Sequence, residues 1–123
     1  MNRLTPLLCA VLLVAASCAS VKPGPAAFDS AAQAIAAAER AGAEELAPVE
    51  LRFAREKLAE AQRGMEQGKY DIALYLIEES EINSELAIEL SRTAQSRRRV
   101  NEQRRELELM REQLESEFGE AFE

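Results

Sequence analysis

The sequence predicts an all-α protein, an antiparallel three-helix bundle or hairpin with a long, protruding C-terminal helix. Apolar side chains recur at spacings of three and four residues along most of the chain after residue 28. Hydrophobic residues make up 47% of the 123 and are mainly Ala and Leu, with no Trp, 4 Phe and 2 Tyr. A β-rich fold uses more aromatic and β-branched residues. Gly and Pro between the periodic segments predict short connections, which place successive helices antiparallel.

The first segment, residues 1–17, is predicted to be a cleaved signal peptide. Arg3 precedes an apolar run from Leu7 to Ala16, and small residues close the run. The run is roughly ten residues long, whereas a membrane-spanning helix needs about twenty, so we expect cleavage and not retention as an anchor.

The residues Ala15-Ala16-Ser17-Cys18 resemble the lipobox of bacterial lipoproteins. The resemblance implies that Cys18 becomes the first residue of the mature chain and carries covalent diacylglycerol and acyl chains such as palmitate. Such chains contribute about 0.8 kcal/mol per buried methylene, and two or three of them anchor a domain to a bilayer stably. By the same resemblance, Ala19 in place of Asp implies sorting to the outer membrane. The alternative is an ordinary secretory signal with an incidental cysteine at its end.

The lipidated Cys18 and a linker are expected to occupy residues 18–28, and the first helix to begin at Asp29 or Ser30. Ser30 and Gln33 have the spacing of a capping box, in which a Ser and a Gln side chain satisfy backbone N–H groups. The small and apolar residues of this helix fall on one face. They are Phe28, Ala31, Ile35, Ala38 and Gly42.

The second helix is expected from Pro48, which suits a first turn, to just before Gly68, which suits the position after a helix end. Its apolar positions alternate spacings of three and four and predict one buried face. They are Leu51, Ala54, Leu58, Ala61 and Met65.

The third helix is expected to begin at Tyr70 or Asp71 and, because no Gly or Pro interrupts it, to continue to about Phe118. A wide apolar arc along its first part, which includes Ile72, Ala73, Ile77 and Leu90, predicts that it packs centrally, against both other helices. The polar stripe that remains is interpreted as a solvated face, with a divalent-cation or cationic-ligand site as the alternative. This stripe contains Asp71, Glu78, Glu81, Glu85 and Glu89.

The segments AIAAAERAGAEELAPVEL and AREKLAEAQRGMEQGKYDIAL, behind the lipobox, resemble the DUF4398 family. The resemblance covers roughly Phe28 to Arg98 and implies a small helical domain of uncharacterised function in an envelope lipoprotein of a Gram-negative bacterium. We expect this domain at residues 29–98 and a charged helical extension at 99–123. The family supplies no catalytic residues.

The end of the third helix is divided by charge, with arginines predominating in residues 92–105 and glutamates in 106–123. Val100, Leu107 and Leu114 are spaced by seven, and Met110 adds a second seam position. This pattern fits a solvated single helix or a short coiled coil, either with itself or with an envelope protein, and the opposite charge blocks favour antiparallel pairing. As an alternative, the cluster of Arg97, Arg98 and Arg99 contacts an anionic envelope polymer.

The composition narrows the function classes. A net charge of −7 disfavours nucleic acid, which is bound through basic surface. The absence of His, with both cysteines among residues 1–18, argues against catalysis, a metal site, a cofactor other than the lipid, and a small-molecule substrate. We therefore expect a non-enzymatic structural or adaptor lipoprotein on the periplasmic face of the outer membrane. The alternative is a module that binds peptidoglycan or lipopolysaccharide.

Overall fold

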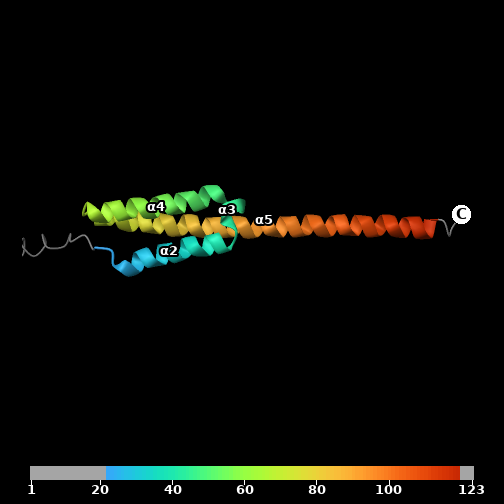
Figure 1. The fold of residues 1–123 in the computed structure, drawn as a ribbon, viewed down its shortest axis with the longest axis horizontal. Helices are drawn as coiled ribbons and strands as arrows, with labels where there is room; N and C mark the ends of the chain where they lie inside the picture. The colour runs from blue at the N-terminus through green and yellow to red at the C-terminus, as the bar shows by residue number, and fades with distance from the viewer. Residues whose placement is uncertain (1–21, 120–123) are drawn as a thin grey trace, which may run out of the picture.

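A computed structural model describes residues 22–119, and in that range the chain is helical, with no strand. The helices are α2 (Pro25–Arg40), α3 (Ala43–Leu46), α4 (Pro48–Glu66) and α5 (Tyr70–Gly119). Helices α2, α4 and α5 run up, down and up, and α5 packs against both other helices and extends far beyond them (Figure 1). The predicted fold class is therefore confirmed, and so is the packing of the third helix against both other helices.

The core is built from small side chains on the face of α5 that α2 and α4 cover. One cluster joins Ile35, Leu51 and Ala87, and a second joins Ala31, Ala61 and Ile77, so each contains residues from α2, α4 and α5. Small side chains let helix axes approach closely, which increases contact between the remaining atoms. The buried residues of α5 are Ala73, Ile77, Ser80, Ser84, Ala87 and Ser91.

The buried serines of α5 fit this core because their hydroxyl groups have hydrogen-bond acceptors. Ser80 Oγ donates to the carbonyl oxygen of Ala54 on α4 at 2.8 Å, and Ser84 Oγ donates to the carbonyl of Ser80 at 2.8 Å. Within residues 22–119, every buried side-chain nitrogen or oxygen has a hydrogen-bond partner. The serines thus let the helices approach one another as closely as alanines would, without the cost of an unsatisfied polar group.

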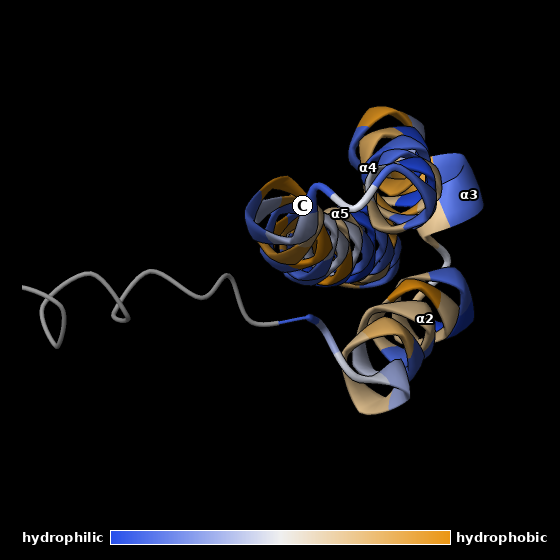
Figure 2. Cartoon of the chain, turned by 90° about the vertical axis from the view of Figure 1, so that its left-hand side faces the viewer, coloured by the Kyte–Doolittle hydropathy of each residue, from blue (hydrophilic) through white to orange (hydrophobic). Residues whose placement is uncertain are grey.

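The buried face of α5 is narrower than the arc the sequence predicts. Ile72 and Leu90, expected on the packed side, are 53% and 39% exposed. Figure 2 views the bundle end on and shows the reason, since α2 and α4 both lie on one side of α5. The opposite side of α5 therefore keeps its apolar side chains in solvent.

The start of α2 differs from the prediction. The helix begins at Pro25, with Gly24 as its N-cap, and no side chain caps it. Ser30 lies inside the helix, so the capping box of Ser30 and Gln33 is wrong. Proline has a φ suited to the first turn and lacks the N–H that would remain unpaired there, which favours the earlier start.

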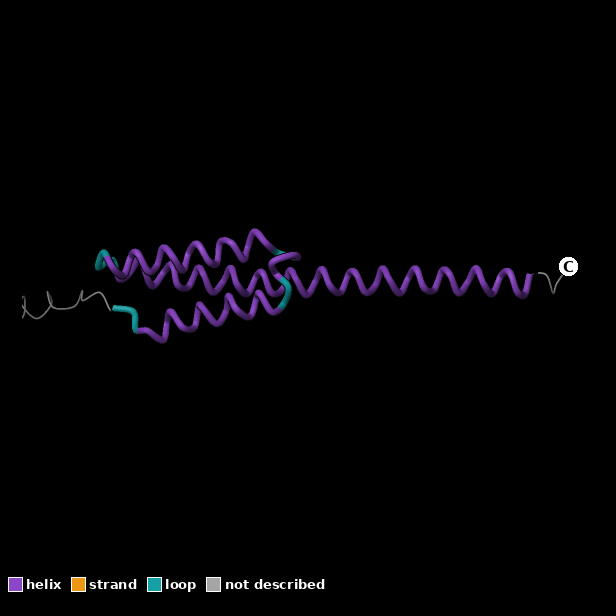
Figure 3. The backbone as a smooth tube through the Cα atoms, viewed as in Figure 1, coloured by secondary structure: helices purple, strands orange, loops and turns teal. Residues whose placement is uncertain are grey.

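Two glycine turns connect the helices at opposite ends of the bundle (Figure 3). Gly42, with φ 81°, ends the turn after α2 and precedes α3, a short helix that the sequence did not predict. Gly68, with φ 70°, follows α4 as predicted. There Lys69 N–H donates to Gly64 O at 2.9 Å and Gly68 N–H to Met65 O at 3.1 Å, the two bonds of a Schellman motif.

Candidate functional site

The candidate site is the part of α5 that leaves the bundle, which we call the free part (residues 96–119). Ser91 is the last buried residue of α5, and from Ser96 to Gly119 every residue is exposed. At 1.5 Å per residue, this part is roughly 35 Å long. No other described helix accompanies it (Figure 1).

The predicted contact residues lie on the free part and are exposed. Val100 is 45% exposed, Leu107 64%, Met110 48% and Leu114 55%. Spacings of seven, three and four place them on one face of a continuous helix, so the structure brings them into one apolar row. Whether that row binds a partner stays a prediction.

The three neighbouring arginines of the cluster differ in their contacts. Arg98 Nη2 donates to Glu45 Oε1 on α3 at 3.0 Å, which ties the start of the free part to the bundle. Nearby, Gln95 Nε2 donates to the carbonyl oxygen of Ala41 at 2.9 Å and so satisfies the C-terminal end of α2. Arg97 and Arg99 form no ion pair within the described chain, so their charges are available at the surface.

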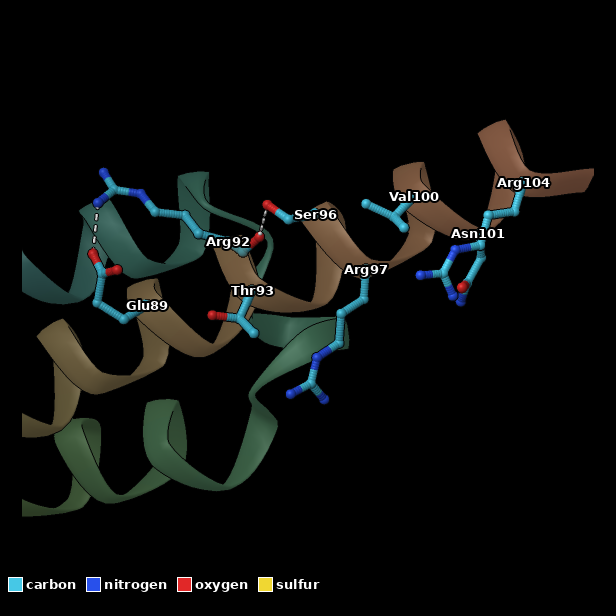
Figure 4. Close-up of a pocket in the computed structure, with 8 residues that line it drawn as sticks. All are labelled: Glu89, Arg92, Thr93, Ser96, Arg97, Val100, Asn101 and Arg104. Atoms are coloured by element: carbon cyan, nitrogen blue, oxygen red, sulfur yellow. Dashed lines mark hydrogen bonds and ion pairs between the residues drawn. The ribbon is translucent and has the colours of Figure 1, made fainter. Parts of the chain in front are cut away.

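A shallow open groove marks the place where α5 leaves the bundle (Figure 4). Arg92 Nη1 pairs with Glu89 Oε1 at 2.6 Å, and Ser96 Oγ donates to the carbonyl of Arg92 at 2.9 Å. All of the lining side chains come from α5, so the groove cannot enclose a small molecule, but it can receive side chains of another helix. The lining residues are Glu89, Arg92, Thr93, Ser96, Arg97, Val100, Asn101 and Arg104.

The sequence did not reveal two groups of polar contacts, one that joins helices and one within α5. Arg55 on α4 donates to Glu39 Oε1 at 2.6 Å and to Glu44 Oε1 at 2.9 Å, and these hydrogen bonds raise the pKa of Arg55. On α5, Tyr75 Oη donates to Glu79 Oε1 at 3.0 Å, which raises the pKa of Tyr75. Both groups are at the surface, and the Arg55 contacts support the arrangement of α4 with α2 and α3.

The acidic stripe of α5 agrees with a solvated face. Asp71, Glu78, Glu85 and Glu89 are exposed and Glu81 is partly exposed. No group of three or more His, Cys, Asp or Glu side chains in residues 22–119 is placed to hold a metal ion. The stripe therefore offers no convergent ligand set in the part of the chain that the structure describes.

The predicted signal peptide and Cys18 lie outside the described residues, so the structure does not bear on them. Among residues 22–119, no helix is both long enough and apolar enough to cross a membrane.

One comparison with known proteins identifies a family. A family model described as "Domain of unknown function (DUF4398)" matches residues 26–103, more than half of the chain. The comparisons with curated proteins and with solved structures found no match to the chain. The matched region is slightly wider at both ends than the resemblance at 28–98, and it includes α2, α3, α4 and the beginning of the free part of α5.

Proposed function

The chain belongs to the DUF4398 family, and from its architecture we propose that it is a non-enzymatic adaptor lipoprotein of the outer membrane. In this proposal, acyl chains on Cys18 hold it to the periplasmic face, and the free part of α5 contacts another protein. The observation that carries the proposal is the exposed apolar row of Val100, Leu107, Met110 and Leu114 on a helix that no other described element covers.

Exposure of this row has a physical cost that a partner helix would offset. Removing apolar surface from water stabilises a complex by about 25 cal/mol per Å². Large exposed apolar patches on soluble domains are typical of interaction surfaces. A helix face with apolar residues at heptad spacing fits another helix, because side chains of one helix pack between those of the other.

The position of the bundle relative to the predicted anchor supports the same role. Lys22 Nζ lies 5.9 Å from the centre of the Tyr70 ring, so the described chain begins beside the N-terminal end of α5. Only a few residues separate Lys22 from Cys18, and they span at most about 15 Å. A lipid on Cys18 would therefore lie near the N-terminal end of α5 and leave the free part accessible to a partner.

The anchor is tested by metabolic labelling of the full chain with a palmitate analogue in a Gram-negative host. We expect label on the unaltered protein and on Cys9→Ala, and none on Cys18→Ala, because only Cys18 is retained after cleavage. Cys9→Ala is the matched control, since it also removes one thiol. Labelling of Cys18→Ala, or an unlabelled wild-type chain released without detergent, would contradict the lipoprotein proposal.

The contact role is tested by photocrosslinking in intact cells from single positions of the free part. A photoreactive amino acid at Val100, Leu107 or Leu114 should give a discrete crosslinked protein, while one at Arg105, on another face of the same helix, should give little. Equal yields from all positions, or no product, would contradict the proposal.

The alternative, a module that binds an envelope polymer, has a separate readout. Saturable binding of the chain to purified peptidoglycan or lipopolysaccharide, lost when Arg97, Arg98 and Arg99 are replaced by Ala, would favour it over the adaptor role. The pairing of Arg98 with Glu45 leaves two of these three charges free of ion pairs within the described residues, which reduces the attraction of the cluster for polyanions.

A further inference from the structure

An exposed apolar row also runs along the part of α5 that belongs to the bundle. Ile72, Tyr75, Ile82 and Leu86 are 53%, 59%, 54% and 47% exposed. Their spacings of three, seven and four residues place them on one side of the helix, away from the buried positions that α2 and α4 cover. The bundle thus leaves one side of α5 uncovered by any described element (Figure 2).

This row and the row on the free part follow the same heptad frame. Leu86 is fourteen residues from both Ile72 and Val100, and Ile82 precedes Met110 by four heptads. Together they form one surface, which we call the α5 stripe. Its members are Ile72, Tyr75, Ile82, Leu86, Val100, Leu107, Met110 and Leu114.

The charges beside the stripe divide α5 into an acidic segment at 70–91, a basic segment at 92–105 and a second acidic segment at 106–119. Residues 70–91 contain Asp71 and five glutamates without a Lys or Arg, whereas residues 92–105 contain six arginines and Glu102 alone. Two such helices placed antiparallel, with their two-fold axis near Ser91, bring residues 77–90 of each copy, with their five glutamates, against the basic segment at 92–105 of the other copy. The attraction occurs twice because of the symmetry.

We propose that the occupant of the α5 stripe is a second copy of this chain, bound antiparallel along α5. With the axis near Ser91, Ile72 faces Met110 of the second copy and Tyr75 faces Leu107. Ile82 faces Val100, and Glu85 lies beside Arg99. Among the polar positions of the same frame, Glu79 faces Gln103 and Glu89 faces Thr93. Leu86 lies opposite Ser96, and Leu114 extends past Tyr70, the first residue of α5 in the second copy.

The parallel arrangement is less favourable for electrostatic reasons. In the parallel arrangement, Glu79 faces Glu79 of the second copy, and Glu89 faces Glu89 of the second copy. This arrangement also places Arg99 beside Arg104 of the second copy, at the positions that flank the stripe. Like charges in a partly dehydrated interface repel, so the antiparallel arrangement is preferred.

The inference rests on the proposed role of α5 as a protein-contact helix, and disulfide crosslinking of the full chain in cell envelopes tests it separately. The double variant Ile82→Cys with Val100→Cys should give a covalent dimer on mild oxidation. The single variants should not, because in the antiparallel dimer each position faces the other. Within one helix these positions are about 27 Å apart, too far for a disulfide, so the bond must join two chains.

Controls distinguish this dimer from random contact. The pair Ile82→Cys with Arg105→Cys should give no dimer, since position 105 lies on another face of α5, and the unaltered chain reports any crosslink through Cys9 or Cys18. A dimer from Val100→Cys alone would establish parallel pairing and overturn the proposal. Absence of a dimer from the designed pair would also overturn it, while photocrosslinks from Val100 to a different protein would leave the adaptor role intact.

Charge reversal gives a second, quantitative test by sedimentation of the purified full chain in detergent. Arg99→Glu or Glu85→Arg should weaken the dimer about tenfold, because each change replaces two attractive pairs with two repulsive ones. Combining both should restore most of the affinity. Arg105→Glu, with the same charge change away from the stripe, should have little effect. Equal weakening by Arg99→Glu and Arg105→Glu would contradict the assigned interface.

Discussion

Replacement of Leu51 by Ala should destabilise the bundle more than any other truncation of one side chain on α4. Leu51 is 1% exposed and is the largest fully buried side chain among the described residues. It packs in the cluster with Ile35 and Ala87, where most of its other neighbours are alanines. Alanine has no side-chain torsion with which to fill a cavity, so little relaxation is expected.

The magnitude follows from the atoms removed. Losing three buried carbons costs about 2.4 kcal/mol at about 0.8 kcal/mol each, and the unfilled cavity adds roughly 1 kcal/mol. A total near 3 kcal/mol is a large fraction of the stability of a small domain, which is of order 0.1 kcal/mol per residue. Chemical unfolding followed by circular dichroism measures the difference.

The matched control is Val49→Ala, two residues earlier on the same helix, where the side chain is 48% exposed. We expect a change within about 0.5 kcal/mol, because little buried surface is lost. A loss below about 1 kcal/mol for Leu51→Ala, or equal losses for both variants, would refute the assignment of Leu51 to the centre of the core.

Three further predictions concern the turn, a hydrogen bond and the free part of α5. Gly68→Ala should destabilise the bundle by about 1 kcal/mol, because Gly68 has a φ of 70° that alanine disfavours. Gly64→Ala should be neutral or stabilising, since the added Cβ would lie 3.5 Å from the Cβ of Ala73, an ordinary contact distance. Equal effects of the two variants in urea unfolding would contradict this difference. Glu79→Gln should lower the pKa of Tyr75 toward its ordinary 10.0, as followed by phenolate absorbance. Because Glu79 raises that pKa, the hydrogen bond stabilises the folded state below pH 10, and this stabilisation is lost as the pH rises through the pKa of folded Tyr75. Deleting residues 104–123 should leave the unfolding free energy of the dilute protein within about 0.5 kcal/mol, because residues 104–119 are exposed, and a loss above 1 kcal/mol would show a packing role.

Periodicity is sufficient to predict the long helices and the packing of α5 against both α2 and α4. Leu51 and Ala54 recur at helical spacing and are buried, and Gly68 ends α4 because it adopts a left-handed φ that other residues disfavour. Helix α3 could not be predicted in this way, since four residues are too few to show a helical period. The capping pattern at Ser30 predicts a later start of α2 than the structure shows, because Pro25 already suits the first turn of a helix.

The candidate site was predicted less completely than the fold. Spacing placed Val100 and Leu114 on one face, which the continuous helix confirms, but the ion pair between Arg98 and Glu45 joins residues far apart in the chain. Such contacts depend on how helices are arranged in space, and local sequence patterns do not contain that information. The exposed side of α5 near Ile72 was likewise missed, because an apolar side chain alone does not reveal whether another helix covers it.

The continuity of α5 has a mechanical consequence. A helix without Gly or Pro between residues 70 and 118 bends little, so the free part behaves as a stiff lever clamped at one end by the bundle. A tilt of about 10° at the clamp would move the far end of a 35 Å lever by about 6 Å. Conversely, a force applied to the far end acts on the contacts between small residues around Ser84 and Ser91. The close packing of these contacts then determines how far α5 tilts.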